Sequence, residues 1–208
     1  MSVEWIAIRG SGIIAFLLLA GSTIWGLLIS TKVLGRAVKA KGIAWFHESL
    51  GIASLVATGV HMYFLFNHDY IDFGYRALFV PGASGWRPLA VALGVVAFYF
   101  LFLVTTSFYV KQWIGQSAWR AIHMMSFGIF VTAGLHGVFS GTDTSHPVVM
   151  GMYFGSLAIV VMLLIIRIAQ ASSPERPARS PARRPVRAEK PAAVNPSEQA
   201  TVELPAQG

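Results

Sequence analysis

Four of the six histidines form two pairs, and their spacing is the first sign of chemistry in the chain. His47 and His61 are 14 residues apart, and His123 and His136 are 13 residues apart. In an α-helix, which rises 1.5 Å per residue, these intervals correspond to about 21 and 20 Å. If the two helices run in the same direction, His47 shares one level with His123, and His61 shares a second level with His136.

Imidazoles that face each other at one level suit the axial ligation of haem iron, because a flat macrocycle fits between two helices. Two levels predict two haems and a path for electrons between them. Two other interpretations stay open: packing histidines of a structural membrane subunit, and a transporter that binds zinc or copper. Ionisable side chains inside a bilayer are rare and mostly functional, which favours a cofactor site. The lack of cysteine argues against the transporter and excludes iron–sulfur clusters and disulfides.

Helical phase distinguishes the two pairs. Fourteen residues at 100° each fall about 40° short of four turns, so the first pair shares a helix face. Thirteen residues fall about 140° short, so the second pair diverges on an ideal helix. The segment around the second pair is therefore expected to bend, to contain a local 3₁₀ or π turn, or to present its ligands from different sides. The candidate weak points are Ser126, Gly128 and Gly134.

The elements that must position these histidines are membrane helices. The 208 residues are 55% hydrophobic and only 12% charged, whereas about a quarter of a soluble domain is charged. Five stretches reach the roughly 20 apolar residues that a spanning helix needs. They are residues 12–30, 44–66, 88–110, 118–139 and 148–168. Because a helix satisfies its own backbone in lipid, the sequence predicts an all-α integral membrane bundle of five transmembrane helices.

Charge predicts the orientation of this bundle. The connection at 31–43 carries four basic residues and no acid, and the third connection offers Lys111 and Arg120, whereas the second and fourth connections hold the three aspartates against Arg76 and Arg87. By the positive-inside rule the N-terminus is outside and the C-terminus inside, in a membrane expected to be the bacterial inner membrane. The net charge of +7 then reflects topology, with membrane lipid and not nucleic acid as the partner. Aromatic residues expected in the interfacial belts are Trp45, Trp86, Tyr109, Trp113 and Trp119.

Residues 169–208 form a second part of the chain, after a haem-binding membrane domain at 1–168. They hold seven of the ten prolines and no aromatic residue, so they are expected to form a disordered cytoplasmic tail. Its basic first half either rests on anionic lipid headgroups or stays solvated. The tail shows no flavin-binding or dinucleotide-binding pattern, so FAD or FMN is expected only through a partner.

Around the histidines the chain resembles the ferric reductase-like transmembrane domain family. The resemblance covers residues 9–168 and rests on the paired spacings, the RGSG run at 9–12, the WRAIH run ending at His123 and the HGVFSGTDT run beginning at His136. The family includes membrane domains of ferric reductases and NADPH oxidases, and the haem-binding subunit of bacterial methionine-sulfoxide reductase. This chain departs from it in two ways: the oxidases and the methionine-sulfoxide subunit usually have six helices, and the oxidases and many reductases carry a C-terminal flavin and nicotinamide domain.

The resemblance implies that His47 and His123 ligate a b-type haem on the cytoplasmic side, and that His61 and His136 ligate a second b-type haem. The implied function is electron transfer from a separate cytoplasmic donor, a flavin reductase or quinol, to an outside acceptor. That acceptor is expected to be ferric iron, oxygen or an oxidised partner. A quinol-linked haem subunit feeding a periplasmic reductase is the alternative, and whether the chain is itself an oxidoreductase enzyme stays open.

Other residues have two or more interpretations each. Arg120 lies three residues before His123, on the same helix face, and either pairs with a haem propionate or sets the topology. Glu48 could orient an imidazole, relay protons or pair with Lys41. His68 and His146 lie near aspartates outside the apolar segments, where they either bind an incoming metal ion or are solvated.

Overall fold

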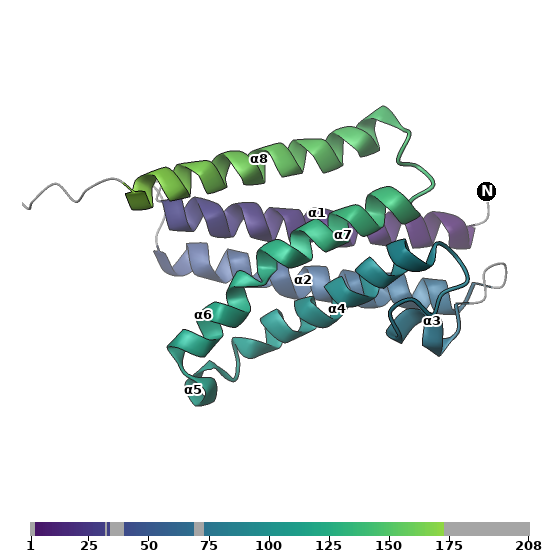
Figure 1. Cartoon of the computed structure of the whole chain (residues 1–208), viewed down its shortest axis with the longest axis horizontal. Coiled ribbons are helices and arrows are strands. Elements are labelled where there is room, and N and C mark those ends of the chain that lie inside the picture. The colour runs from purple at the N-terminus through teal and green to yellow at the C-terminus, as the bar shows by residue number, and fades with distance from the viewer. Residues whose placement is uncertain (1–2, 32, 34–39, 69–72, 173–208) are drawn as a thin grey trace, which may run out of the picture. The chain divides into compact units, whose positions relative to one another are not determined.

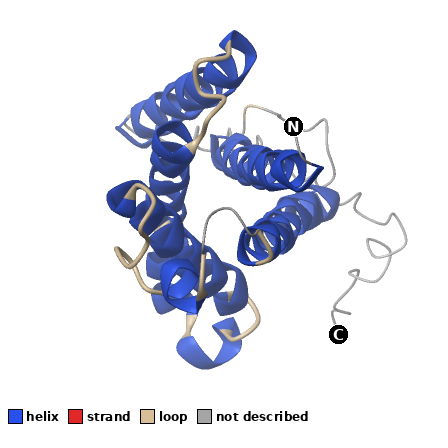
Figure 2. Cartoon of the chain, turned by 90° about the vertical axis from the view of Figure 1, so that its right-hand side faces the viewer, coloured by secondary structure: helices blue, strands red, loops and turns tan. Residues whose placement is uncertain are grey.

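The computed structural model describes residues 3–31, 33, 40–68 and 73–172. Within these ranges the chain forms helices and no strands (Figures 1 and 2). The helices are α1 (Val3–Thr31), α2 (Ala40–Phe66), α3 (Tyr75–Phe79), α4 (Pro88–Ser107), α5 (Lys111–Ile114), α6 (Gln116–Met124), α7 (Ser126–Ser140) and α8 (Pro147–Ser172). Residues 173–208, which make up nearly all of the predicted tail, lie outside the described residues, as does most of the basic connection at 31–43.

Five helical stretches are long and apolar enough to cross a membrane. They are Val3–Thr31, Ala44–Phe66, Pro88–Ser107, Gln116–Ser140 and Pro147–Ser172. The predicted all-α bundle of five spanning helices is therefore confirmed. The first helix begins nine residues before its predicted start. The prediction stopped at Arg9 because a charge interrupts the apolar run, but in the structure Arg9 is paired with Asp143. The last helix continues to Ser172, so it takes in the first residues of the predicted tail.

The first helix, α1, holds together the helices that carry the histidines. It packs against α2 on one side and against α7 and α8 on others, while α4 packs against α7 (Figures 1 and 2). One core cluster joins α1, α7 and α8, and consists of Phe16, Ala20, Leu27, Phe130, Val160 and Leu163. A second joins α1, α4 and α7, and consists of Leu19, Ala97, Leu101 and Ile129. Interdigitated side chains of this kind fix α4, α7 and α8 relative to α1.

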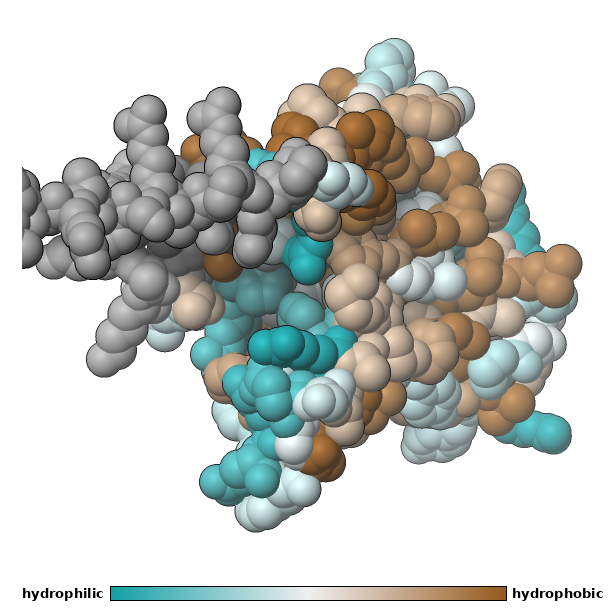
Figure 3. Space-filling view, turned by 60° about the vertical axis from the view of Figure 1, so that its left-hand side comes forward, coloured by the Kyte–Doolittle hydropathy of each residue, from teal (hydrophilic) through white to brown (hydrophobic). Residues whose placement is uncertain are grey.

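The surface of the helices is that of a multi-pass integral membrane protein. Figure 3 shows one face, on which apolar side chains cover much of the described surface and hydrophilic ones gather mainly toward one end. Large apolar side chains such as Leu89 and Val148 are more than 70% exposed, which soluble monomers rarely allow over wide areas. Hydroxyl groups of Thr23, Thr106 and Thr132 donate to the carbonyl four residues earlier, so these donors are satisfied within their own helices.

The fourth spanning stretch is interrupted at Met125, between α6 and α7. The N–H of Met125 donates to the carbonyl of Ile122, only three residues back, at 3.0 Å. The break is adjacent to Ser126, one of the predicted weak points, whereas Gly128 and Gly134 lie within uninterrupted helix. The irregularity predicted from helical phase is therefore confirmed.

Candidate functional site

The structure brings His47 and His123 together. We call them the inner pair, after the orientation predicted from charge. Their ring centroids lie 5.9 Å apart, with the ring planes at 77°. The two rings come from α2 and α6, which are far apart in sequence, so the contact is the one that the level argument predicted.

His61 and His136, the outer pair, both line one cavity. The cavity has a volume of about 230 Å³ and is lined by residues of α1, α2, α3, α4, α7 and α8, together with side chains of the α7–α8 connection. Apolar side chains make up most of its wall, among them Leu19, Leu101 and Ile129. The second predicted pair therefore also shares a single site.

Three of the four rings are held by a backbone carbonyl of a neighbouring helix. The Nδ1 atoms lie 2.9 Å from the oxygen of Ser22 for His47, 2.9 Å from that of Ile8 for His61, and 2.8 Å from that of Ala90 for His136. A carbonyl oxygen can only accept a hydrogen bond, so Nδ1 carries the proton in each ring. In the neutral imidazole the lone pair then lies on Nε2, which is the nitrogen left to bind a metal.

A glycine four residues after each carbonyl makes room for the ring. These are Gly26 for His47, Gly12 for His61 and Gly94 for His136. A Cβ added at these positions would lie 3.0, 3.1 and 2.6 Å, respectively, from the nearest ring atom. Four residues make about one helical turn, so the carbonyl and the glycine lie on the same helix face. We call each combination a carbonyl–glycine seat.

The two seats on α1 belong to one regular register between α1 and α2. Three side chains of α2, spaced by seven residues, donate to three carbonyls of α1 that are also spaced by seven residues. The pairs are His61 with Ile8, Ser54 with Ala15, and His47 with Ser22. A seven-residue repeat is the period of helices that coil around each other. Coiling removes the 40° shortfall expected on a straight helix, so both histidines of α2 face α1.

His123 lacks such a seat. Neither of its ring nitrogens has a hydrogen-bond partner among the described residues. Its ring instead stacks on Trp119, one turn earlier on α6, with centroids 5.2 Å apart and planes at 23°. The Nζ atom of Lys111 lies 4.3 Å from the centroid of the same indole. The indole Nε1 is buried and finds no acceptor in the part of the chain that the structure describes.

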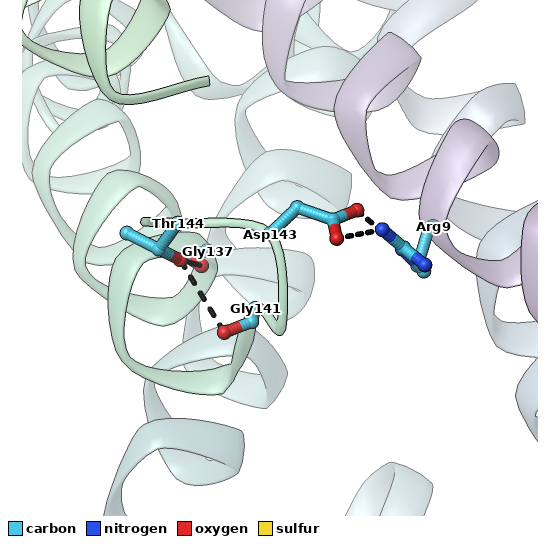
Figure 4. A network of polar contacts seen from close by, with 5 residues as sticks. All are labelled: Arg9, Gly137, Gly141, Asp143 and Thr144. Atoms are coloured by element: carbon cyan, nitrogen blue, oxygen red, sulfur yellow. Dashed lines mark hydrogen bonds and ion pairs between the residues drawn. The ribbon is translucent and has the colours of Figure 1, made fainter. Parts of the chain in front are cut away.

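An ion pair lies at the edge of the outer cavity (Figure 4). Arg9 of α1 pairs with Asp143 of the α7–α8 connection, and both residues line the cavity. Beside them the hydroxyl of Thr144 donates to the carbonyls of Gly137 and Gly141, at 3.4 and 3.3 Å. These contacts tie the connection after α7 to the start of α1, next to the outer pair.

Two further candidates lie near the inner pair. Arg120 is exposed and pairs with no side chain among the described residues, so its predicted role at a propionate stays a prediction. Glu48 accepts a hydrogen bond from the hydroxyl of Tyr109 at 3.2 Å, a partner that the sequence did not suggest. Partial desolvation, the hydrogen bond to Glu48 and its negative charge raise the pKa of Tyr109.

The two loop histidines are not among the residues that line the outer cavity. His68 contacts the ring of Trp5, with centroids 5.6 Å apart. His146 is exposed, and its Nδ1 accepts a hydrogen bond from the backbone N–H of Val148 at 3.3 Å. Over the described ranges, no group of three or more His, Asp or Glu residues could hold a metal ion.

The seats and the aromatic stack were not predicted from the sequence. A signal for two of the seats was present, because Gly12 and Gly26 are 14 residues apart, the same interval as His47 and His61. Trp119 was expected only in an interfacial belt, yet its position four residues before His123 places both on one helix face.

No family model matches the chain, and neither does any curated protein or solved structure with which it was compared.

Proposed function

We propose that the protein carries electrons across a membrane through two b-type haems, one held by the inner pair and one by the outer pair. The observation that supports this most strongly is the shared state of three imidazoles. Each donates Nδ1–H to a backbone carbonyl, which fixes the ring orientation and leaves Nε2 as the ligating atom. A histidine that binds a metal through one ring nitrogen usually donates a hydrogen bond from the other nitrogen in this way.

The residues present fit a haem at each level. Each level offers two imidazoles, whereas a protein zinc site takes three or four protein ligands, and no such group occurs among the described residues. The two imidazoles of the inner pair, with ring centroids 5.9 Å apart, would hold the group between them. The outer pair borders a cavity with mostly apolar walls, which suits a macrocycle.

Bound haem would supply a one-electron iron couple at each level. The chain's own residues orient the ligands and set their surroundings. The carbonyls of Ser22, Ile8 and Ala90 hold three rings in one tautomer, and a hydrogen-bonded Nδ1–H makes Nε2 a stronger donor. Apolar side chains around the outer pair keep water away from the ligating nitrogens, which tunes the potential of a bound metal.

The direction of transfer rests on the distribution of charge. The connection at 31–43 carries four basic residues and no acid, and Lys111, Arg120 and Arg167 belong to the same side, whereas the second and fourth connections set Asp69, Asp72 and Asp143 against Arg76 and Arg87. The positive-inside rule then places the inner pair toward the cytoplasm of a bacterial inner membrane. The donor in this proposal is a separate flavin reductase, which would bring FAD or FMN, or a quinol. The acceptor is ferric iron, oxygen or an oxidised partner outside, and a periplasmic reductase is one such partner.

The test is the colour of the purified full-length protein after expression with ample haem supply. A dithionite-reducible low-spin spectrum with about two haems per chain is expected. Colourless protein would refute the proposal, and colourless protein that binds zinc would favour a transporter. Reduction by a flavin reductase with its nicotinamide nucleotide, compared with reduction by quinol in vesicles, identifies the donor.

A further inference from the structure

We propose that Trp119 is the positioning residue of His123, and that its indole ring takes the place of the carbonyl–glycine seat that the other three histidines have. The inference rests on the proposed function, because it concerns how strongly the inner iron is held by its second imidazole. The argument begins with what fixes the His123 ring.

His123 is held by less of the backbone than any other member of the two pairs. It lies on α6, a helix of nine residues that ends at the break at Met125. On its other side α6 begins after Gly115, whose φ of 82° is in the left-handed region that favours glycine. Its other end joins α7 through Met125 alone, so α6 and α7 form one bent spanning stretch, and His123 lies on the short arm beyond the bend.

The ring contacts of His123 are aromatic. One face lies parallel to the indole of Trp119, at 5.2 Å and 23°, and its edge meets His47 at 5.9 Å. Offset stacking of two rings restrains rotation about the side-chain bonds without using either ring nitrogen. Both nitrogens of His123 therefore stay available to bind a metal, and the stack sets the orientation of the ring.

The indole is in turn held by Lys111 and by packing. The ammonium group of Lys111 lies 4.3 Å from the indole centroid, which is within the range of a cation–π contact. The indole N–H contributes no hydrogen bond within the described residues although it is buried, and burying an unpaired donor costs free energy. The indole therefore lies against His123 because of its ring contacts and not because of its polar group.

The consequence is an inner ligand that depends on one side chain. Without the indole, His123 has neither a hydrogen bond nor a stacking partner to hold it toward His47. His123 would then give way to a small external ligand at a haem bound by the inner pair, whereas the two seated imidazoles of the outer pair would stay in place.

The test is carbon monoxide binding by the dithionite-reduced full-length protein, measured by difference absorption, with total haem counted in parallel. Wild type is expected to bind little carbon monoxide, because both irons carry two imidazoles. Trp119→Ala is expected to bind about one carbon monoxide per two haems, or to lose the inner haem. Trp119→Phe, which keeps a ring but not the N–H, is expected to resemble wild type.

Two variants calibrate the result. His123→Ala removes the ligand itself and should lose the inner haem. Trp113→Ala removes an indole from the neighbouring helix α5 that is 76% exposed, and it should leave carbon monoxide binding unchanged. If Trp119→Ala does not accumulate, Lys111→Met decides the question, with expected carbon monoxide binding above that of wild type and below about one per two haems.

Two results would overturn the inference. One is a Trp119→Ala protein, or a Lys111→Met protein in its place, with both haems and wild-type carbon monoxide binding. The other is equal carbon monoxide binding by the Ala and Phe variants of Trp119, since the ring would then not matter. A wild-type protein without haem refutes the proposed function itself, whereas two low-spin haems together with an inert Trp119→Ala refute only the role of Trp119.

Discussion

The outer and inner pairs use the same side chains but are supported differently. Both outer histidines are anchored to backbone carbonyls and packed against glycines, and both line one cavity. In the inner pair only His47 is anchored in this way, and His123 rests on an indole. A backbone carbonyl is not removed by substituting its own side chain, whereas the stack is lost with one substitution at Trp119. The comparison predicts a rigid outer site and an inner site that is easier to perturb.

Removing a ligand has the largest expected effect. His47→Ala and His123→Ala should each abolish the same haem, and His61→Ala and His136→Ala should each abolish the other, so that every variant retains about one haem per chain. Redox titration with absorption spectra identifies which haem remains.

The pairing itself is at stake in that experiment. A spectrum of His47→Ala that matches His136→Ala, and not His123→Ala, would contradict the arrangement seen in the structure. His146→Ala is the matched control, because this histidine is exposed and is not among the residues that line the outer cavity; it should retain both haems.

Filling a seat should have the next largest effect. A Cβ at Gly94 would lie 2.6 Å from Nδ1 of His136, so Gly94→Ala must displace the ring from its carbonyl. Loss of such a supporting contact typically weakens metal binding by about 10–100-fold, and here the loss should be confined to the outer haem. Haem titration into the depleted protein measures it.

Smaller shifts are expected at the two seats on α1. A Cβ at Gly12 or Gly26 would lie 3.1 or 3.0 Å from the ring, so the imidazole needs to move less. Gly10→Ala, on the same helix with nothing within 4 Å of its Cβ, is the matched control and should gain up to about 1 kcal/mol of helix stability. Similar haem affinity for Gly94→Ala and Gly10→Ala would show that the seats do not matter.

Breaking the ion pair at the outer cavity should cost little. The side chains of Arg9 and Asp143 are 22% and 28% exposed, and a partly solvated pair of this kind contributes at most about 1 kcal/mol. Arg9→Gln should lower thermal stability slightly and retain both haems, with Arg76→Gln, at an exposed arginine, as the control. Loss of the outer haem in Arg9→Gln alone would show that Arg9 has a role in cofactor binding.

The smallest effect concerns Tyr109. Its pKa is raised by partial desolvation and by Glu48, so its contribution to stability is present below the unfolded pKa of about 10 and is lost as the pH rises through the raised value. The stability difference between wild type and Tyr109→Phe should therefore shrink in alkaline solution. A difference that grows with pH would contradict this sign.

The levels of the histidines could be predicted by counting residues, because helix rise is fixed and membrane helices are long. The need for a break between His123 and His136 also followed from helical phase, and it lies at Met125. The seats could not be predicted, since nothing in the sequence says which helix lies beside which. Ser22 and Gly26 become a support for His47 only once α1 is known to pack against α2.

The register between α1 and α2 has a consequence for how far apart the two sites can be. Its bonds recur every seven residues, from Ile8 through Ala15 to Ser22. Deleting one such repeat from each of these helices would shorten the gap by about 10 Å and still leave each histidine opposite its carbonyl. The distance between the two sites can therefore change only in steps of seven residues. A deletion of any other length in both helices would move either His47 or His61 away from its carbonyl.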